Sequence, residues 1–319
     1  MVTVKGLTDI PGILVGHATD YDGLTGCTVV LCEAGAVAGG DIRGSATGTE
    51  EWDTLNPLHV DAVIHAVTFA GRSAFGLEAA SGVRRFLEHK GVGVEFGGAH
   101  IPIVPCAILF DLGMGKPGVR PTREMGESAS AAASDGPVEE GAVGAGAGAT
   151  VGKILGMKNA MKSGIGSFTM ELDGGIKVSA LAAVNALGDV RDPKTGKIIA
   201  GARKSPDSME FVDAAEVLKT RAEIKPARQN TTLVVVATNA SLSKVQATKL
   251  AQLASLGMAR TIDPVNTMSD GDLVIALSLG TGQARIDALG VAAAQAVSES
   301  ILRAVRLAPT LGGLPGLKR

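Results

Sequence analysis

The sequence predicts an α/β protein, because β-prone apolar runs alternate with segments whose apolar residues recur at helical spacing. The C-terminal region, residues 231–319, shows this most clearly, in the order strand, helix, strand, helix. We therefore predict one layered α/β domain over residues 1–319, with a division near residue 150 or 225 as the alternative.

In the first third of the chain, short apolar runs are separated by glycines, as is typical of buried strands between turns. Residues 73–90 carry apolar side chains at helical spacing, with Ser73 as the expected cap of that helix. The expected strands are residues 28–31, 62–67 and 107–110, the last of them preceded by the apolar run 101–104.

The middle of the chain changes composition. Residues 129–152 are rich in Ala, Gly and Ser, and we interpret them as a glycine-rich loop around a site rather than a linker, because no run of charges or prolines follows. Residues 176–185 are expected to form a long strand. Residues 190–230 are polar and contain several prolines, so we expect a long exposed connection of the kind that proteases cleave.

The C-terminal region becomes regular again. Residues 232–238 are strongly β-prone, and Ser241 is the expected cap of the helix that follows. Residues 272–279 are expected to form another strand and residues 286–307 the last helix. The apolar faces of these two helices are expected to be Leu242, Val245, Leu250, Leu253 and Met258 in the first, and Leu289, Val297, Ile301 and Val305 in the second.

Composition argues against several kinds of partner. The net charge is −2 and the basic and acidic residues are interspersed, so we expect no nucleic-acid partner. The N-terminus lacks the pattern of a secretory signal, and no run approaches the roughly 18 apolar residues of a membrane-spanning helix. Cys27, Cys32 and Cys106 are unevenly spaced and fit reduced thiols. We expect a soluble, cytoplasmic protein without a membrane partner.

Motifs for cofactors are weak. The glycine-rich segment 144–153 fails the P-loop pattern, because no Gly-Lys-Ser/Thr closes it. Gly144, Gly146 and Ala149 match the dinucleotide fingerprint, which keeps a nucleotide-binding protein as an alternative, although such matches are common in Ala/Gly-rich sequence. The five histidines are scattered without zinc-ligand spacing, and no Gly-x-Ser-x-Gly elbow is present. We expect neither a metal nor an organic cofactor.

The junction between Asn230 and Thr231 offers a different chemistry. A threonine hydroxyl is a weak nucleophile unless a base lies beside it. If Thr231 becomes an N-terminus, its own α-amino group, with an ordinary pKa near 7.7–8.0, can accept the hydroxyl proton. The alternative is that Thr231 and Thr232 only begin a β-strand, in which threonine is favoured.

A resemblance to a known family favours the first interpretation. Residues 230–240, Asn-Thr-Thr-Leu-Val-Val-Val-Ala-Thr-Asn-Ala, closely resemble the self-cleavage junction of the DmpA-like family. This family, peptidase family S58, contains L-aminopeptidase/D-amidase/D-esterases, β-peptidyl aminopeptidases and nylon-oligomer hydrolases. The resemblance spans nearly the whole chain and includes residues 10–18, 26–30, 101–105, 148–153 and 184–189. It implies a layered α-β-β-α fold of the N-terminal-nucleophile type, like that of ornithine acetyltransferases.

The resemblance also implies roles for particular residues. Thr231 would be the nucleophile, and cleavage of the Asn230–Thr231 bond would give an α chain, 1–230, and a β chain, 231–319. Asn185 matches the family asparagine whose side-chain amide helps to form the oxyanion hole. A donor of this kind lowers the barrier by roughly 3–4 kcal/mol.

Further residues are implied around this centre. Asp270 and Asp272, in the Asp-Gly-Asp form of the nylon-hydrolase branch, would orient the threonine amine and hydroxyl or shuttle the proton; an ordinary turn before a strand is the alternative. Lys153 matches an active-site lysine, and Lys162 is a rival for that role. Phe110 stands where several relatives have a tyrosine, so the contribution of that hydroxyl is absent or comes from another group.

The function implied by the resemblance is a self-processing amide hydrolase that cleaves a small amide or short peptide substrate through an acyl-enzyme ester. The motifs are most similar to the nylon-oligomer branch, and homo-oligomers of four αβ units are common in the family. Two alternatives stay open: an acyltransferase of the ornithine-acetyltransferase type, and an uncleaved, non-catalytic family member. The sequence leaves the stereochemistry of the substrate open.

Overall fold

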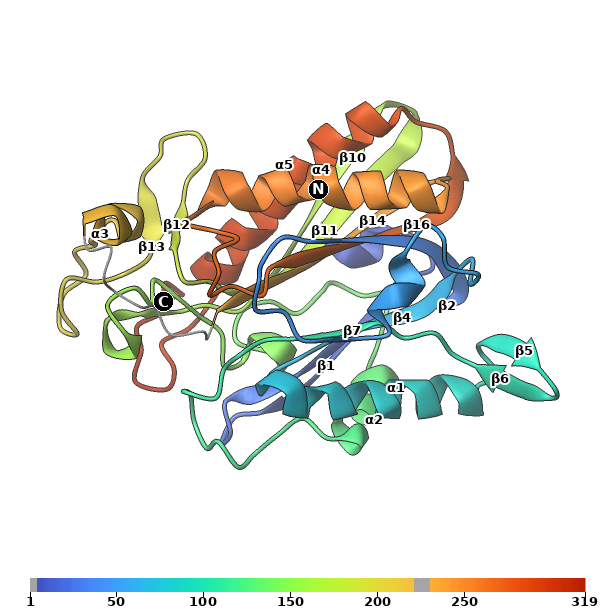
Figure 1. Ribbon diagram of the computed structural model, residues 1–319, viewed down its shortest axis with the longest axis horizontal. Helices are drawn as coiled ribbons and strands as arrows, with labels where there is room; N and C mark the ends of the chain where they lie inside the picture. The colour runs from blue at the N-terminus through green and yellow to red at the C-terminus, as the bar shows by residue number, and fades with distance from the viewer. Residues whose placement is uncertain (1–4, 221–229, 319) are drawn as a thin grey trace.

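The computed structural model describes residues 5–220 and 230–318, which form four layers in the order α-β-β-α (Figure 1). The middle layers belong to one nine-stranded sheet with the order β10-β11-β14-β16-β2-β4-β7-β3, in which β1 also pairs with β2. The strands are β1 (Leu14–Asp20), β2 (Thr25–Ile42), β3 (Thr49–Glu50), β4 (Ile64–Ala70), β7 (Cys106–Ile108), β10 (Ile165–Leu172), β11 (Ile176–Asn185), β14 (Thr231–Ala240) and β16 (Leu273–Gly282).

The sheet makes two layers because β2 is long enough to take part in both. The first part of this 18-residue strand pairs with β1 and β4, and its last part pairs with β16. Between these two parts the register with β4 shifts, from Leu31 to Ala36. Such an irregularity bends a strand and increases its twist, which lets one sheet fold over itself.

Helices cover both outer faces of the folded sheet. α4 (Lys244–Thr261) and α5 (Ile286–Arg306) lie together at the top of Figure 1, and α1 (Glu78–His89) and α2 (Arg123–Ala131) lie at the bottom. Three separate apolar cores fill the spaces between the layers. Representative members are Val234, Ala254 and Val297 under α4 and α5, Phe69, Val235 and Ile275 between the sheet layers, and Val29, Ala80 and Val83 under α1 and α2. The predicted layered fold is confirmed.

The β-prone run after residue 230 forms β14, which is internal to the sheet between β11 and β16. Val234 and Val236 face the helices, whereas Leu233 and Val235 face the core between the sheet layers. Burial on both faces explains why this run is apolar throughout rather than alternating. By the same alternation, Thr231 faces the same side as Leu233, toward the space between the two sheet layers.

Two predicted helix caps are wrong. The Ser73 N–H bonds to the Leu109 carbonyl and the residue has a φ of 55°, so only a 3₁₀ turn starts there and α1 begins at Glu78 without a side-chain cap. Ser241 still continues the strand pairing, because its N–H bonds to the Gly282 carbonyl. Ser243 caps α4 instead, in a reciprocal capping box with Gln246.

The long exposed connection predicted for residues 190–230 contains short regular elements in its described part. β12 (Asp189–Arg191), β13 (Ile198–Ala200) and β15 (Ile262–Asp263) form a small sheet, and α3 (Ala214–Thr220) follows. Residues 221–229 lie outside the described residues.

The other described elements are two strand pairs and six 3₁₀ helices. β5 (Val94–Phe96) pairs with β6 (Ala99–Ile101), and β8 (Thr150–Val151) pairs with β9 (Met161–Lys162). The 3₁₀ helices described are Leu7–Asp9, Trp52–Leu55, Ser73–Leu77, Gly144–Gly146, Met157–Asn159 and Asp173–Gly175.

Among the described residues, α5 is the one helix long and apolar enough to cross a membrane by length and composition. However, 72% of its apolar window is buried inside the fold. The side chains predicted for its apolar face, including Leu289 and Ile301, pack against the sheet. Its apolar character is therefore that of a core helix.

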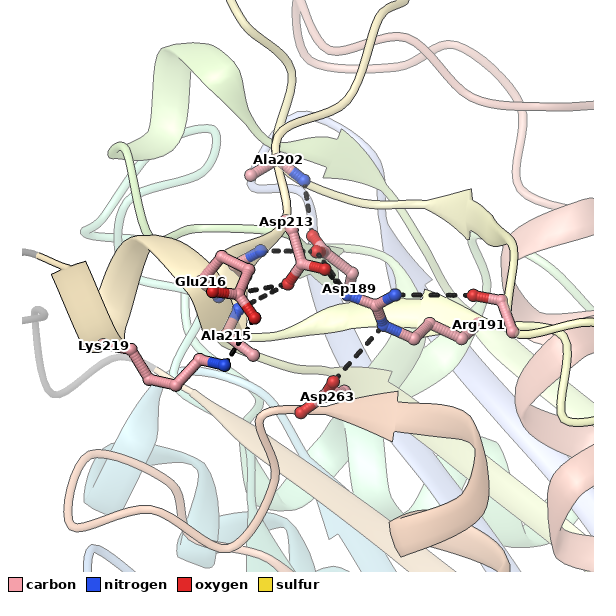
Figure 2. A network of polar contacts seen from close by, with 10 residues as sticks. Asp189, Arg191, Ala202, Asp213, Ala215, Glu216, Lys219 and Asp263 are labelled. Atoms are coloured by element: carbon pink, nitrogen blue, oxygen red, sulfur yellow. Dashed lines mark hydrogen bonds and ion pairs between the residues drawn. The ribbon is translucent and has the colours of Figure 1, made fainter.

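A buried carboxylate organises the small sheet that precedes the junction (Figure 2). Asp189 is completely buried, and its two oxygens accept N–H bonds from Ala202 and Ala214, each at 2.8 Å. Arg191 lies 2.8 Å from Asp213 and 3.4 Å from Asp263, so it joins α3 to β15. Asp189, which lies in β12, thereby links this strand to the segment after β13 and to the start of α3.

Asp189→Asn is expected to lower the free energy of unfolding by about 1–3 kcal/mol. The amide keeps one acceptor oxygen but turns an NH₂ group toward one of the two backbone N–H groups, which is left unpaired inside the fold. Thermal unfolding monitored by circular dichroism measures the effect. Asp213→Asn is the matched control, because the Asp213 side chain is 38% exposed and its loss is expected to cost little. Equal melting temperatures for both variants would contradict this role.

Candidate active site

Thr231 and Asn185 face each other at the end of two paired strands. They are direct partners in the antiparallel ladder of β11 and β14, and both are buried. Side chains in such a pair have Cβ atoms about 4.5–5.5 Å apart. The two residues that the sequence places 46 positions apart (231 − 185) are therefore neighbours in the fold.

The carbonyl group of Asn230 is held at two points. The Thr231 hydroxyl lies 2.5 Å from the Asn230 carbonyl oxygen and donates to it, and the backbone N–H of Gly271 donates to the same oxygen at 2.9 Å. The Asn230 side chain is also engaged, because its amide nitrogen donates to the Ser269 carbonyl at 3.1 Å. The carbonyl oxygen of the intact peptide bond thus contacts both the threonine hydroxyl and a fixed N–H donor.

The loop that carries this N–H donor is fixed by the two aspartates. Asp272 accepts bonds from the backbone N–H groups of Thr232 (2.6 Å) and Asn266 (2.9 Å). Asp270 accepts bonds from the backbone and hydroxyl of Thr267, at 2.9 and 2.5 Å. In the intact chain, these contacts make both carboxylates supports for the loop and for the start of β14.

Gly271 has a steric reason to be glycine. A Cβ atom there would lie 3.0 Å from the Thr231 hydroxyl oxygen and 2.8 Å from the Ala46 carbonyl oxygen. Sequence reasoning missed this residue as a contributor, because its contribution is a backbone N–H and not a side chain. The signal available in the sequence was its position between the two aspartates.

Lys153 lies beside Asn185. Its ammonium nitrogen is 2.8 Å from both the backbone oxygen and the side-chain oxygen of Asn185. Burial lowers the pKa of Lys153 to about 7, against the opposing effect of the negative charges on Asp270 and Asp272. The pKa of Asp272 is raised to about 7, first by burial and then by the charge of Asp270. Neutral and charged forms of these groups are therefore close in free energy at neutral pH.

Lys162 occupies a different place from Lys153. Its ammonium group donates to the carbonyl oxygens of Gly146, Ala149 and Ser163, at 3.3, 2.8 and 2.8 Å. Burial lowers its pKa to about 7 as well, but the carboxylate that opposes this shift is Asp111 rather than the pair beside Thr231. Lys162 thus supports the glycine-rich loop from within.

The Asn185 side chain is bonded through both of its ends. Its oxygen accepts from Lys153 and from the N–H of Thr150 at 3.1 Å, and its amide nitrogen donates to the Phe110 carbonyl at 2.9 Å. Phe110 contributes its backbone oxygen to the position of Asn185.

A small cavity of about 10 Å³ lies beside Lys153 and is lined by Phe110, Asp111, Gly148, Thr150 and Lys153, together with Gly113, Met114 and Met157. The last three also line a wider outer cleft of about 380 Å³. Gly148 of the glycine-rich segment therefore borders the cavity, and the shared residues lie between the cavity and the outer cleft. Sequence reasoning missed Met114, Met157 and the buried Asp111, because nothing in their local pattern separates them from core residues.

Comparisons with known proteins identify the family of the chain. Residues 5–319 match peptidase family S58. An uncharacterized aminopeptidase of Mycobacterium leprae (strain TN) is 37% identical, over 98% of this chain and 93% of that protein. The 6-aminohexanoate-oligomer endohydrolase of Kocuria sp. (strain KY2) is 28% identical, over 93% of this chain and 85% of that protein.

The fold has a counterpart among solved structures. The L-aminopeptidase D-Ala-esterase/amidase of Ochrobactrum anthropi, a variant of the Ntn hydrolase fold, superposes with a TM-score of 0.73 and 19% identity, covering 98% of this chain and 88% of that one. This likeness concerns the fold, whereas the match over residues 5–319 and the 37% identical relative concern the sequence. The chain therefore belongs to peptidase family S58 and is a hydrolase of amide or peptide bonds.

Proposed function

We propose that this chain cleaves its own Asn230–Thr231 bond and that Thr231 then acts as the N-terminal nucleophile of the amide hydrolase. The observation that carries the proposal is the position of the Asn230 carbonyl oxygen. It lies 2.5 Å from the Thr231 hydroxyl and 2.9 Å from the Gly271 N–H. An N–H donor held at a carbonyl oxygen stabilises the negative charge that develops there during attack.

In the self-cleavage reaction, the Thr231 oxygen attacks the Asn230 carbonyl carbon and the Gly271 N–H stabilises the resulting oxyanion. The C–N bond then breaks, the nitrogen takes a proton to become the Thr231 amine, and an ester joins Asn230 to the threonine oxygen. Water hydrolyses this ester, which releases the Asn230 carboxylate and restores the hydroxyl. Both chains stay in one fold, because β14 lies between β11 and β16.

The precursor lacks the free amine, so another group must remove the hydroxyl proton. Lys153 fits this role, because its pKa of about 7 leaves much of it neutral at physiological pH. It is held on Asn185, the residue directly across the ladder from Thr231. Asp270 and Asp272 keep the loop and the strand start in place during the reaction.

After cleavage, the amine of Thr231 takes over as the base and returns the proton to the leaving amine of the substrate. Asn185 and the Gly271 N–H are then the groups that stabilise the oxyanion, and hydrolysis of the acyl-enzyme ester completes the cycle. The aminopeptidase and oligomer-hydrolase names of the relatives support a small amide or short peptide as the substrate. Assembly into four αβ units and a cytoplasmic location complete the proposal.

A denaturing gel with N-terminal sequencing tests the processing step. The purified protein is expected to give two bands, the smaller beginning Thr-Thr-Leu-Val. Turnover is tested separately, with a panel of D-, L- and β-aminoacyl anilides and short linear polyamides. A lone full-length band in an active preparation would overturn the proposed nucleophile, and sedimentation of the purified protein tests the assembly.

Self-cleavage is expected to be slow in acid and to level off above neutral pH. Burial lowers the pKa of Lys153 from 10.5 to about 7, so its reactive neutral form disappears as the pH falls below 7. The rate is then expected to be about a hundredfold lower at pH 5 than on the plateau, because each unit below the pKa reduces the neutral form tenfold. Cell-free synthesised chain, shifted to buffers of different pH and sampled on gels, gives this profile. An equal rate at pH 5 and pH 8 would exclude Lys153 as the base.

A further inference from the structure

The residue before the cleaved bond shows how the site holds an acyl group. Attack by Thr231 on Asn230 gives an ester between the Asn230 acyl group and the threonine oxygen. Turnover gives an ester between the substrate's acyl group and the same oxygen. The two intermediates have the same connectivity, and water must reach and hydrolyse both of them. Asn230 is therefore the first acyl group that this site processes.

The contacts of Asn230 define an acyl pocket within the site. The residue is buried, its carbonyl oxygen accepts from the Gly271 N–H at 2.9 Å, and its side-chain nitrogen donates to the Ser269 carbonyl at 3.1 Å. A parallel bridge between Asn230 and Asp270 aligns the two segments. One loop thus offers a donor to the reacting carbonyl and an acceptor to the side chain of the acyl group.

The Ser269 carbonyl can only accept a hydrogen bond, so it selects for an N–H or O–H donor at that place. In Asn230 the donor nitrogen is four bonds from the reacting carbonyl carbon, through Cα, Cβ and Cγ. The loop around this acceptor is held by the bonds of Asp270 to Thr267 and of Asp272 to Thr232. The distance between donor and acceptor in the pocket is therefore fixed by the fold.

We propose that the mature enzyme prefers acyl groups that carry an N–H donor four bonds from the scissile carbonyl carbon, bound by the Ser269 carbonyl in the place that Asn230 vacates. The simplest such group is succinamoyl, which is asparaginyl without its α-amino group, and 4-aminobutanoyl places an amine at the same distance. This preference rests on the proposed function, because it needs Thr231 to form an acyl-enzyme. It adds the chemical class of the acyl group and names the atom that recognises it.

A matched pair of substrates tests the preference on the cleaved, full two-chain enzyme. Succinamoyl 4-nitroanilide carries the amide NH₂, and 4-oxopentanoyl 4-nitroanilide has a methyl group in its place, with the same shape and no charge. The succinamoyl substrate is expected to have a kcat/KM about tenfold higher, which corresponds to about 1.4 kcal/mol from one partly buried hydrogen bond. Butanoyl and leucyl anilides in the same assay report whether the enzyme hydrolyses amides that lack the donor.

The outcomes separate this inference from the proposed function. Equal kcat/KM for the matched pair, or hydrolysis of leucyl anilide without hydrolysis of succinamoyl anilide, would overturn the acyl preference and leave Thr231 chemistry intact. No hydrolysis of any anilide by fully cleaved protein would instead count against the proposed turnover.

A second measurement does not depend on added substrates. Asn230→Asp keeps the shape of the side chain but replaces the donor by an acceptor facing the Ser269 carbonyl, so self-cleavage is expected to slow about tenfold or more. Asn230→Gln retains a donor at a different distance and is the matched control for the position of the nitrogen. Self-cleavage of Asn230→Asp at the wild-type rate would contradict recognition by Ser269.

Discussion

Thr231→Ala is expected to remain a single chain of 319 residues and to lose amide hydrolysis by roughly 10⁴-fold or more. The substitution removes the oxygen that lies 2.5 Å from the Asn230 carbonyl oxygen, and without cleavage no amine is released to act as base. Alanine is smaller than threonine, so it fits the strand start without a clash, and among the described side-chain hydrogen bonds the substitution removes only the one to the Asn230 carbonyl. Gel analysis, N-terminal sequencing and an anilide assay measure the result.

Thr231→Ser is the control for this prediction, because it keeps a hydroxyl and, after cleavage, an N-terminal amine. We expect it to process itself and to retain measurable turnover. The two variants together separate loss of the oxygen from loss of the fold, provided that both show the wild-type circular dichroism spectrum. Turnover by a folded Thr231→Ala protein near the wild-type rate would end the proposal.

Lys153→Met is expected to slow self-cleavage by about 10²–10⁴-fold, the usual contribution of a general base. Methionine has a similar length and no basic group, so it also leaves the Asn185 oxygens without the donor that lies at 2.8 Å. Lys153→Arg separates charge from basicity, because arginine keeps a positive charge but does not lose its proton near neutral pH. We expect Lys153→Arg to be slow as well. The full-length band, followed in time after cell-free synthesis, gives the rate.

Lys162→Met is the matched control, because this lysine is also buried and has a similarly lowered pKa. Its loss leaves the carbonyl oxygens of Gly146, Ala149 and Ser163 without their ammonium donor, so the main expected effect is a lower melting temperature. The decisive comparison is the cleavage rate of the folded fraction of each variant. Normal cleavage in Lys153→Met with none in folded Lys162→Met would reverse the assignment.

Local sequence determined the elements whose own pattern is strong. The apolar run 176–185 forms β11 as predicted, and the helical spacing of residues 286–307 gives α5. The first residue of each helix was harder to predict from the sequence. A serine can cap a helix only after the strand pairing of the preceding residues has ended. Ser241 is still paired with Gly282, and Ser243 is the first serine with an N–H and a hydroxyl available for capping. Residues 189–220 form a small sheet and a helix around Asp189. This arrangement depends on contacts between residues far apart in the sequence, so local periodicity does not predict it.

The sequence by itself determined the layered α/β class, through apolar periodicity, and it predicted the roles of Asn230 and Thr231 through their resemblance to the DmpA-like family. Only the tertiary structure decided which groups surround that bond. It placed Lys153 on Asn185 and Lys162 under the glycine-rich loop, and it brought the Gly271 N–H to the Asn230 carbonyl. The physical reason is that every residue except proline has a backbone N–H, so the sequence does not show which N–H contacts the bond. The two lysines have the same chemistry and differ only in the groups that they contact in the folded protein.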